Sequence, residues 1–273
     1  MSILVEHAWL AEHLADTNLV VLDATLPPTG VTPPLDTHAR YLAQHIPGTI
    51  FFNIDDISDH ASPYPHMLPS PEEFAQKMSA LGVSDTATIV VYEQQGVFSA
   101  SRAWWMLKTM GAQNVHLLNG DLAAWRAAGL PLETGEVHRA PTTFHANFNA
   151  SAVVSYEELQ SKLAAQQQIL DARSAGRFAG TAPEPRPGLR SGHMPGATST
   201  PFTDLVDQGK LKSQDALRAY FSGKGVDLEK PITTTCGSGV TAAVIALGLE
   251  LSGAHDVALY DGSWAEYAQR SET

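Results

Sequence analysis

Hydrophobic residues in this 273-residue chain fall into two kinds of segment that alternate along it. Short apolar or β-branched runs bounded by turn residues are typical of buried strands, and longer runs with a three-to-four-residue spacing are typical of helices. The short runs predict strands at 19–24, 49–54, 88–92, 115–118, 169–172, 232–235 and 257–260. The longer runs predict helices at 5–15, 72–81, 99–110 and 242–253. Strands separated by helices favour parallel βαβ units, so the pattern predicts an α/β fold.

Two capping boxes mark where helices begin. Ser70 and Glu73 have the spacing of a capping box, with Pro71 at the first helical position. Ser155 and Glu158 repeat the same spacing in the second half of the chain. We therefore expect helices to start directly after Ser70 and Ser155.

The chain contains an internal repeat. LVVLDATL (19–26) resembles QQILDARS (167–174), and HIPGTIFFNIDDI (45–57) resembles HMPGATSTPFTDL (193–205). Residues 88–120 align without a gap with 230–262, which places Gln94 opposite Cys236. The sequence therefore predicts a duplicated unit whose chemistry is confined to one copy.

Length and the repeat together predict two domains, because 273 residues exceed what one small core organises. Residues 133–150 lack a clear period and are typical of a connection between domains. We predict an N-terminal domain at 1–134, a linker at 135–152 and a C-terminal domain at 153–273. The first domain has Gln94 in place of a cysteine, and the second contains Cys236.

Composition excludes several classes of function. The formal net charge of −12 argues against nonspecific binding to nucleic acid or to an anionic membrane surface. No apolar run approaches the ~20 residues of a membrane span, and the N-terminal residues lack the pattern of a signal peptide. A single cysteine fits a reducing compartment, so we expect a cytoplasmic protein. No metal-ligand spacing or P-loop is present, and no cofactor is expected.

The lone cysteine stands between a predicted strand and a predicted helix. The loop that follows Cys236 has the sequence Gly237, Ser238, Gly239, Val240, Thr241. Backbone N–H groups and the positive end of a helix dipole converge at such a turn, and both favour thiolate over thiol. A lone cysteine is more often a small buried hydrophobe. The surrounding strand, glycine loop and helix favour a nucleophile whose substrate binds to the loop backbone.

Three kinds of chemistry fit a loop of this type. A cysteine phosphatase needs an arginine at the position of Ala242, so phosphoryl chemistry is not expected. Gly237, Gly239 and Ala242 satisfy the G-x-G-x-x-A pattern of dinucleotide binding, with Asp261 as a candidate ribose ligand. A cradle that holds a persulfide anion on Cys236 uses every feature of the loop.

Two further clusters carry ionisable side chains. Arg173, Arg177, Arg186 and Arg190 lie within 18 residues against the single acid Glu184, which predicts a local positive site for a carboxylate. In the first copy, His66 follows three aspartates that together with it could transfer a proton. These aspartates are Asp55, Asp56 and Asp59.

The two copies, their HIPG and HMPG motifs and the lone cysteine resemble the tandem rhodanese-domain sulfurtransferases. The resemblance spans nearly the whole chain and implies two rhodanese-like α/β domains, each a parallel sheet flanked by helices. The loop CGSGVT is similar to that of members that use 3-mercaptopyruvate, whereas thiosulfate-preferring members typically carry basic residues after the cysteine. Gly237 and Ser238 occupy those positions here.

The resemblance also implies a reaction. Cys236 attacks the sulfur of 3-mercaptopyruvate, pyruvate leaves, and the resulting persulfide passes its sulfur to thioredoxin, a small thiol or cyanide. Arg177 in GRF and Arg186 in EPR match the family's substrate-carboxylate arginines. Arg173 and Arg190 receive no such role and could be structural.

The family's proposed proton relay matches Ser238, His66 in HMLP and Asp55 in NID. We therefore expect a 3-mercaptopyruvate sulfurtransferase. Three alternatives stay open: a thiosulfate-preferring sulfurtransferase, a dinucleotide-binding protein that uses GSGVTA, and a noncatalytic sulfur carrier that keeps Cys236 without needing the arginines.

Overall fold

The computed structural model describes residues 2–271 and divides the chain into two compact units. The first unit comprises the chain up to His60 together with Leu68–Asn149 and Gln208–Lys210. The second comprises Ala61–Met67, Ala150–Asp207 and the chain from Leu211 onward. His66 thus belongs to the second unit, although it lies in the first half of the sequence.

The first unit is built on a five-stranded sheet in the order β1-β5-β4-β2-β3. Every neighbouring pair in it is parallel. Its strands are β1 (Leu4–Val5), β2 (Leu19–Asp23), β3 (Thr49–Phe51), β4 (Thr88–Tyr92) and β5 (Asn114–Leu118). All residues of β2 are buried, which is typical of a parallel strand covered on both faces.

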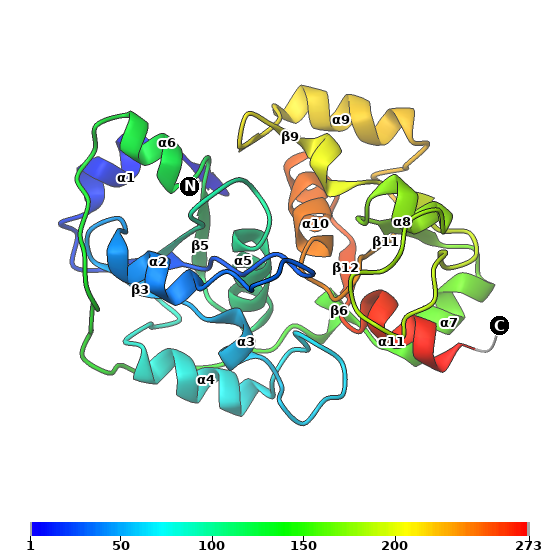
Figure 1. Ribbon diagram of the computed structural model, residues 1–273, viewed down its shortest axis with the longest axis horizontal. Helices are drawn as coiled ribbons and strands as arrows, with labels where there is room; N and C mark the ends of the chain where they lie inside the picture. The colour runs from blue at the N-terminus through cyan, green and yellow to red at the C-terminus, as the bar shows by residue number, and fades with distance from the viewer. Residues whose placement is uncertain (1, 272–273) are drawn as a thin grey trace. The chain divides into compact units, whose positions relative to one another are not determined.

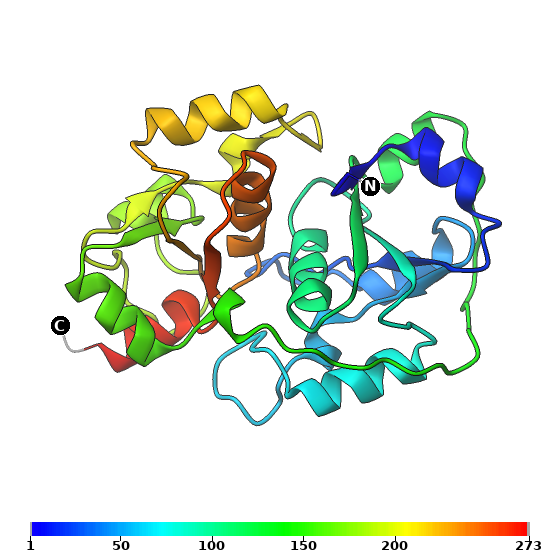
Figure 2. The same ribbon diagram turned by 180° about the vertical axis from the view of Figure 1, so that it is seen from behind.

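The helices of the first unit connect these strands. They are α1 (His7–His13), α2 (Thr37–Ala43), α3 (Ile54–Ile57), α4 (Pro71–Ala80), α5 (Ala100–Thr109) and α6 (Leu122–Ala127). Helices α1 and α6 lie side by side in both views (Figures 1 and 2). Leu10 of α1 and Trp125 of α6 belong to one buried cluster with Val90 of β4, so these two helices cover part of the sheet.

The second unit repeats the arrangement with a five-stranded sheet in the order β6-β12-β11-β7-β8. Its pairs are also all parallel. The strands are β6 (Val153–Val154), β7 (Gln168–Asp171), β8 (Thr198–Ser199), β11 (Ile232–Thr235) and β12 (Val257–Tyr260). A separate hairpin joins β9 (Val206–Asp207) to β10 (Lys210–Leu211). The matching strand orders confirm the predicted duplication and the predicted α/β fold.

Helices flank the second sheet as well. They are α7 (Tyr156–Ala164), α8 (Ala175–Ala179), α9 (Gln214–Gly223), α10 (Ala242–Leu251) and α11 (Ser263–Arg270), with 3₁₀ turns at Ala150–Ala152 and Phe202–Leu205. Helices α7 and α11 lie side by side (Figures 1 and 2), and Leu159 and Trp264 pack in one buried cluster. Eight of the ten residues of α10 are buried, since nearly every one is apolar.

Both predicted capping boxes form. The hydroxyl of Ser70 accepts from the N–H of Glu73 at 3.2 Å, and that of Ser155 accepts from Glu158 at 3.2 Å. The predicted strands at 88–92, 232–235 and 257–260 are also confirmed residue for residue.

Two predicted elements are wrong at their ends. Val5 does not begin a helix, because it pairs with Leu118 as part of β1. The strand predicted at 49–54 ends at Phe51, and Ile54 begins α3. The cause is Asn53, whose side chain accepts from the N–H of Asp56 at 3.2 Å and caps that short helix.

The segment after Glu133 runs along the first unit rather than hanging between elements. The N–H of Thr142 donates to the carbonyl of Ser79 at 3.0 Å, and that of Asn147 donates to Met110 at 2.9 Å. The domain boundaries placed from the sequence at 134 and 153 stay predictions.

Candidate active site

Cys236 directly follows β11, at the edge of the sheet where the parallel strands have their carboxyl ends. Each residue of β11 is buried, and β7 and β12 pair with it on either side. The thiol is a free cysteine, and the residue is 2% exposed. Sites in open α/β sheets form at this edge, so the topology places Cys236 where chemistry is expected.

The loop between β11 and α10 forms a cradle of N–H groups. Gly239 has a φ of +79°, a conformation that suits glycine and turns the chain back toward the sulfur. Within residues 2–271, the N–H groups of Val240, Thr241 and Ala242 donate to no protein acceptor. These residues are buried and stand at the start of a ten-residue helix, whose dipole adds positive potential. Three unpaired donors therefore surround the place where an anion would sit.

The first unit shows the same cradle in a filled state. Glu93 occupies the position that corresponds to Thr235, and its carboxylate accepts from three N–H groups of the loop that follows β4. The distances are 2.7 Å from Phe98, 3.1 Å from Ser99 and 3.2 Å from Ala100. These donors align with Val240, Thr241 and Ala242. One copy thus supplies its own anion, whereas the other leaves the same donors for a bound one.

The N-terminus of α11 holds the Cys236 loop from its other side. The hydroxyl of Ser263 accepts from the N–H of Cys236 at 3.2 Å and donates to the carbonyl of Tyr260 at 3.0 Å. The N–H of Trp264 donates to the carbonyl of Cys236 at 2.9 Å, and that of Ala265 donates to Gly237 at 3.0 Å. Ser263 is not among the residues predicted from the sequence, although its place just after Gly262 in the repeat is a usable signal.

Ser263 adopts a φ of +50°, which is uncommon for a residue with a side chain. A non-glycine residue holds this conformation only where its surroundings determine it. Here the bonds on either side of the hydroxyl provide that constraint, so Ser263 fixes the loop at Cys236.

Ser238 and His66 come together. The hydroxyl of Ser238 and Nδ1 of His66 are 3.0 Å apart, which is hydrogen-bonding distance. Ser238 is buried and follows Cys236 by two positions, while His66 is partly exposed at a φ of +63°. A histidine paired with a hydroxyl can move a proton at neutral pH.

Asp55 lies on α3 in the first unit and is exposed at the side chain. Asp56 is likewise exposed on this helix, and its carboxylate lies 3.7 Å from the ammonium of Lys77. The role of Asp55 behind His66 stays a prediction.

Glu184, the single acid among the four arginines, is the centre of a buried ion-pair network. Its carboxylate accepts from Arg173 at 2.8 Å and from Arg177 at 2.6 Å. Arg173 also pairs with Asp171 at 2.6 Å. Burial lowers the pKa of Arg173, but the hydrogen bond and charge of Asp171, with that of Glu184, raise this pKa above its ordinary value. The predicted positive site is therefore partly neutralised from within.

Arg173 and Arg190 serve the structure of the second unit. The guanidinium of Arg173 is fully buried and lies 4.3 Å from the ring of Trp264. That of Arg190 lies 4.9 Å from the same ring and 5.7 Å from the ring of Tyr267. Both arginines thereby hold α11 against the segment that contains α8.

Arg177 remains half-buried and reaches the Cys236 loop. A Cβ built on Gly237 would lie 2.7 Å from its Nη2, so the guanidinium fills the space that any side chain at 237 would need. Arg186, the other predicted carboxylate ligand, is partly exposed in the segment after α8. A side chain at position 237 would therefore have to displace the guanidinium of Arg177.

The dinucleotide interpretation fits this geometry poorly. Arg177 covers Gly237 at the point where a pyrophosphate would approach the backbone. Asp261, the candidate ribose ligand, is 3% exposed.

No group of three histidine, cysteine or carboxylate side chains suited to a metal ion occurs among the residues described. Over the same residues, no helix is both long enough and apolar enough to cross a membrane.

Comparison with known proteins bears on the whole chain. The model of the rhodanese-like domain matches twice, at residues 6–128 and 155–270. The 3-mercaptopyruvate sulfurtransferase of Escherichia coli K12 is 47% identical over 267 residues, covering 97% of this chain and 94% of the relative. The human 3-mercaptopyruvate sulfurtransferase is 44% identical over 278 residues, covering 98% and 92%. Bovine thiosulfate sulfurtransferase is 41% identical over 277 residues, covering 98% and 92%.

The fold gives the same result. The crystal structure of the 3-mercaptopyruvate sulfotransferase SseA from Escherichia coli matches with a TM-score of 0.89 at 44% identity, covering 97% of this chain and 99% of that one. These likenesses support sulfur transfer by a rhodanese-fold enzyme. With a rhodanese-like domain in each half and relatives of this similarity over its full length, the chain belongs to the rhodanese family.

Proposed function

We propose that this protein is a 3-mercaptopyruvate sulfurtransferase that works through a persulfide on Cys236. The observation that carries the proposal is the open cradle of Val240, Thr241 and Ala242 around a lone cysteine. The filled cradle of the first unit supports it, because the corresponding donors there bind the carboxyl oxygens of Glu93. A persulfide is an anion, and its terminal sulfur would take the place that corresponds to that carboxyl group.

The chemical step balances with the groups present. The Cys236 thiolate attacks the thiol sulfur of 3-mercaptopyruvate, a sulfur–sulfur bond forms, and the carbon–sulfur bond breaks. The electron pair of the broken bond leaves on carbon as the enolate of pyruvate. The proton of the substrate thiol is transferred to the carbon of that enolate, which gives pyruvate. A persulfide anion remains on the enzyme.

Ser238 and His66 are the groups that would carry this proton. Their 3.0 Å contact involves a residue two positions after Cys236, and an imidazole paired with a hydroxyl is suited to proton transfer. Asp55 is proposed as the third member of this relay, as the family resemblance implies. The backbone of Gly237, Gly239, Val240 and Thr241 would bind the transferred sulfur.

Arg177 and Arg186 are proposed to hold the substrate carboxylate. A guanidinium binds a planar carboxylate through two parallel hydrogen bonds. Glu184 accepts from Nε and Nη2 of Arg177 at 3.2 and 2.6 Å, which fixes the direction of that side chain.

Thiosulfate is the second donor to consider, because bovine thiosulfate sulfurtransferase is 41% identical. The geometry at Gly237 favours 3-mercaptopyruvate, since Arg177 occupies the space of a basic side chain there. We propose thiosulfate as a slower donor. The acceptors we propose are thioredoxin, small thiols and cyanide, in a reducing compartment such as the cytoplasm.

Intact-protein mass spectrometry after mixing with 3-mercaptopyruvate or with thiosulfate tests the proposal. With 3-mercaptopyruvate we expect a gain of one sulfur atom on Cys236 and one pyruvate per chain, and with thiosulfate much less labelling. The variant Cys236→Ser should gain no sulfur and release no pyruvate. Retained turnover in that variant would remove the cysteine from the mechanism, and labelling without turnover toward any thiol would indicate a sulfur carrier.

A further inference from the structure

The first unit has a hollow of its own at the place that corresponds to the catalytic loop. This opening of about 390 Å³, here called the Gln94 pocket, is lined by Arg40 of α2, Gln44 directly after α2, Gln94 and Gln95 after β4, and Arg126 of α6. Gln94 is the residue that the repeat aligns with Cys236. The copy without a nucleophile has therefore kept a polar pocket at the carboxyl ends of its strands.

The two arginines of this pocket carry charges that no carboxylate neutralises. Within the described chain, the guanidinium of Arg40 makes no hydrogen bond or ion pair. Arg126 donates to the neutral amide oxygen of Gln44. Arg173 and Arg177 of the second unit, by contrast, both bind Glu184. In a protein of net charge −12, two cations lining one hollow without an acid favour an external anion.

Arg40 has a counterpart in the candidate active site. The pair Arg40–Tyr41 lies in the first helix after β2, as Arg177–Phe178 lies in the first helix after β7. The first unit thus keeps an arginine where the second presents one to the Cys236 loop. Arg126 of α6 adds a second guanidinium to this pocket.

The floor of the Gln94 pocket excludes catalysis of the kind proposed for Cys236. Nε2 of Gln94 donates to the buried carboxylate of Asp23 at 2.9 Å and to the carbonyl of Gln44 at 3.1 Å. In the second unit Arg173 pairs with Asp171, but the first unit has Thr25 at the position of Arg173. The amide of Gln94 therefore binds the Asp23 carboxylate in place of an arginine. Glu93 already fills the N–H cradle beneath. What remains is a site that can bind a ligand but cannot form a covalent bond with it.

We propose that the Gln94 pocket binds a small oxyanion between Arg40 and Arg126, as a second ligand site separate from the Cys236 loop. Oxygens of a carboxylate or of a sulfur oxyanion match guanidinium donors equally, and the amide groups of Gln44 and Gln95 provide neutral donors beside them. Pyruvate represents the first source, and thiosulfate or sulfite the second.

The stoichiometry of binding tests this proposal in the full chain. We expect Cys236→Ser protein to bind two equivalents of labelled pyruvate in equilibrium dialysis. Adding Arg40→Gln and Arg126→Gln should weaken one equivalent at least about tenfold and leave the other. Adding Arg186→Ala instead should weaken the other equivalent, so failure of the proposed function and failure of this proposal are separable.

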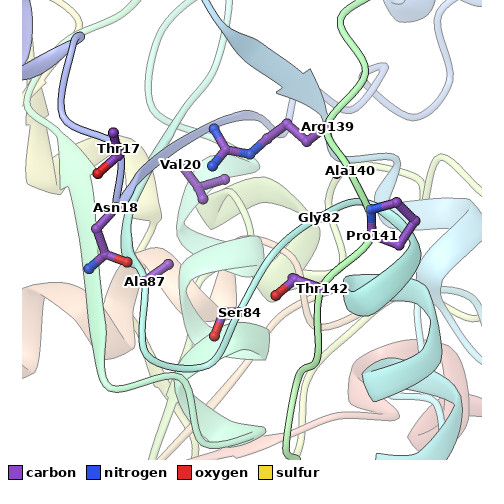
Figure 3. Close-up of a pocket in the computed structure, with 10 residues that line it drawn as sticks. All are labelled: Thr17, Asn18, Val20, Gly82, Ser84, Ala87, Arg139, Ala140, Pro141 and Thr142. Atoms are coloured by element: carbon purple, nitrogen blue, oxygen red, sulfur yellow. The ribbon is translucent and has the colours of Figure 1, made fainter.

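Arg139→Gln is the matched control, because Arg139 lines a different hollow of the first unit (Figure 3). There a single guanidinium donates to the carbonyl of Leu19 at 3.2 Å and lies among Asn18, Ser84 and Thr142. This variant should keep both equivalents.

Competition identifies the source of the oxyanion. If thiosulfate or sulfite displaces pyruvate from the Gln94 pocket at a concentration below the Kd of pyruvate, the natural ligand is a sulfur oxyanion. If displacement needs a higher concentration, the natural ligand is a carboxylate. If the protein binds only one equivalent of every anion, and only Arg186→Ala abolishes that binding, the proposal is overturned. An unchanged second equivalent in the Arg40/Arg126 double variant, or its loss with Arg139→Gln, overturns it as well.

Discussion

At the scale of single residues, Gly237 and Arg177 share the space beside Cys236. Gly237 is not a flexible link, because the Nη2 atom of Arg177 would lie 2.7 Å from a Cβ at that position. The same guanidinium is fixed by Glu184 at 2.6 Å, so it cannot move aside without breaking a short ion pair. Gly237 therefore leaves room for the guanidinium of Arg177 next to Cys236.

The change Gly237→Ala tests this dependence. We expect the methyl group to displace Arg177 and to raise the KM for 3-mercaptopyruvate roughly tenfold, with a much smaller effect on alkylation of Cys236 by a neutral reagent. Steady-state kinetics and iodoacetamide labelling measure the two effects. Gly223→Ala is a suitable control, since Gly223 has no positive φ and no atom lies within 4 Å of its Cβ position. Equal losses in both assays would mean that the methyl group deforms the loop itself.

At the scale of elements, α11 and α10 together shape the Cys236 loop. The first residue of α10, Ala242, contributes the last N–H group of the cradle. The first residues of α11 bind the carbonyls of Cys236 and Gly237 and the N–H of Cys236. The loop is thus held from the side of α11 by backbone and hydroxyl contacts, while its N–H groups on the side of α10 stay unpaired. Ser263 is a positioning residue in this arrangement.

The change Ser263→Ala should lower kcat/KM roughly fivefold to tenfold, because it removes the acceptor of the Cys236 N–H while leaving the helix in place. We expect the pH profile of Cys236 alkylation to shift as well, which a purely structural defect would not produce. Ser252→Ala is the matched control, since that buried hydroxyl bonds the carbonyl of Gly248 on α10, away from the loop. An unshifted profile with full activity would remove Ser263 from the site.

At the scale of the whole molecule, the two copies share one sheet order but differ in how each satisfies its cradle. Glu93 is buried against the N–H groups of Phe98, Ser99 and Ala100. Burial raises its pKa from an ordinary 4.5 to about 7, against the lowering effect of these hydrogen bonds. The first unit therefore contains a buried carboxyl group that holds a loop in place and has a pKa near neutral pH.

This titration predicts a pH dependence of stability. A carboxyl group whose folded pKa is raised stabilises the fold fully below pH 4.5, and this contribution is lost as pH rises toward about 7. Between pH 4.5 and about 7, the free energy of unfolding of the wild type should fall by on the order of 3 kcal/mol because of Glu93. The Glu93→Gln variant should not show this fall. The hydrogen bonds that the substitution alters add an offset that does not depend on pH.

Urea unfolding of both proteins between pH 4 and 8 measures the difference in slope. Tryptophan fluorescence suits the purpose because Trp9, Trp104, Trp105 and Trp125 all lie in the first unit. Parallel curves for the two proteins would show that Glu93 keeps one charge state throughout.

Much of this protein follows from local pattern alone. The runs at 88–92 and 232–235 are strands because β-branched and apolar residues between turn signals have no better place than a parallel sheet. Ser70 and Ser155 begin helices because their hydroxyls satisfy N–H groups three residues ahead. Elements that depend on a distant partner were missed or misplaced. Val5 is a strand only because β5 lies beside it.

The site divides in the same way. The repeat, the lone cysteine and the glycine loop are readable in the sequence because each is local. Only the tertiary structure brought Ser263 to the N–H of Cys236 across 27 residues, placed Arg177 over Gly237, and buried Glu184 between two arginines. It also showed that Glu93 fills in one copy the cradle that is open in the other. Contacts of this kind are set by packing between elements, and no spacing along the chain encodes them.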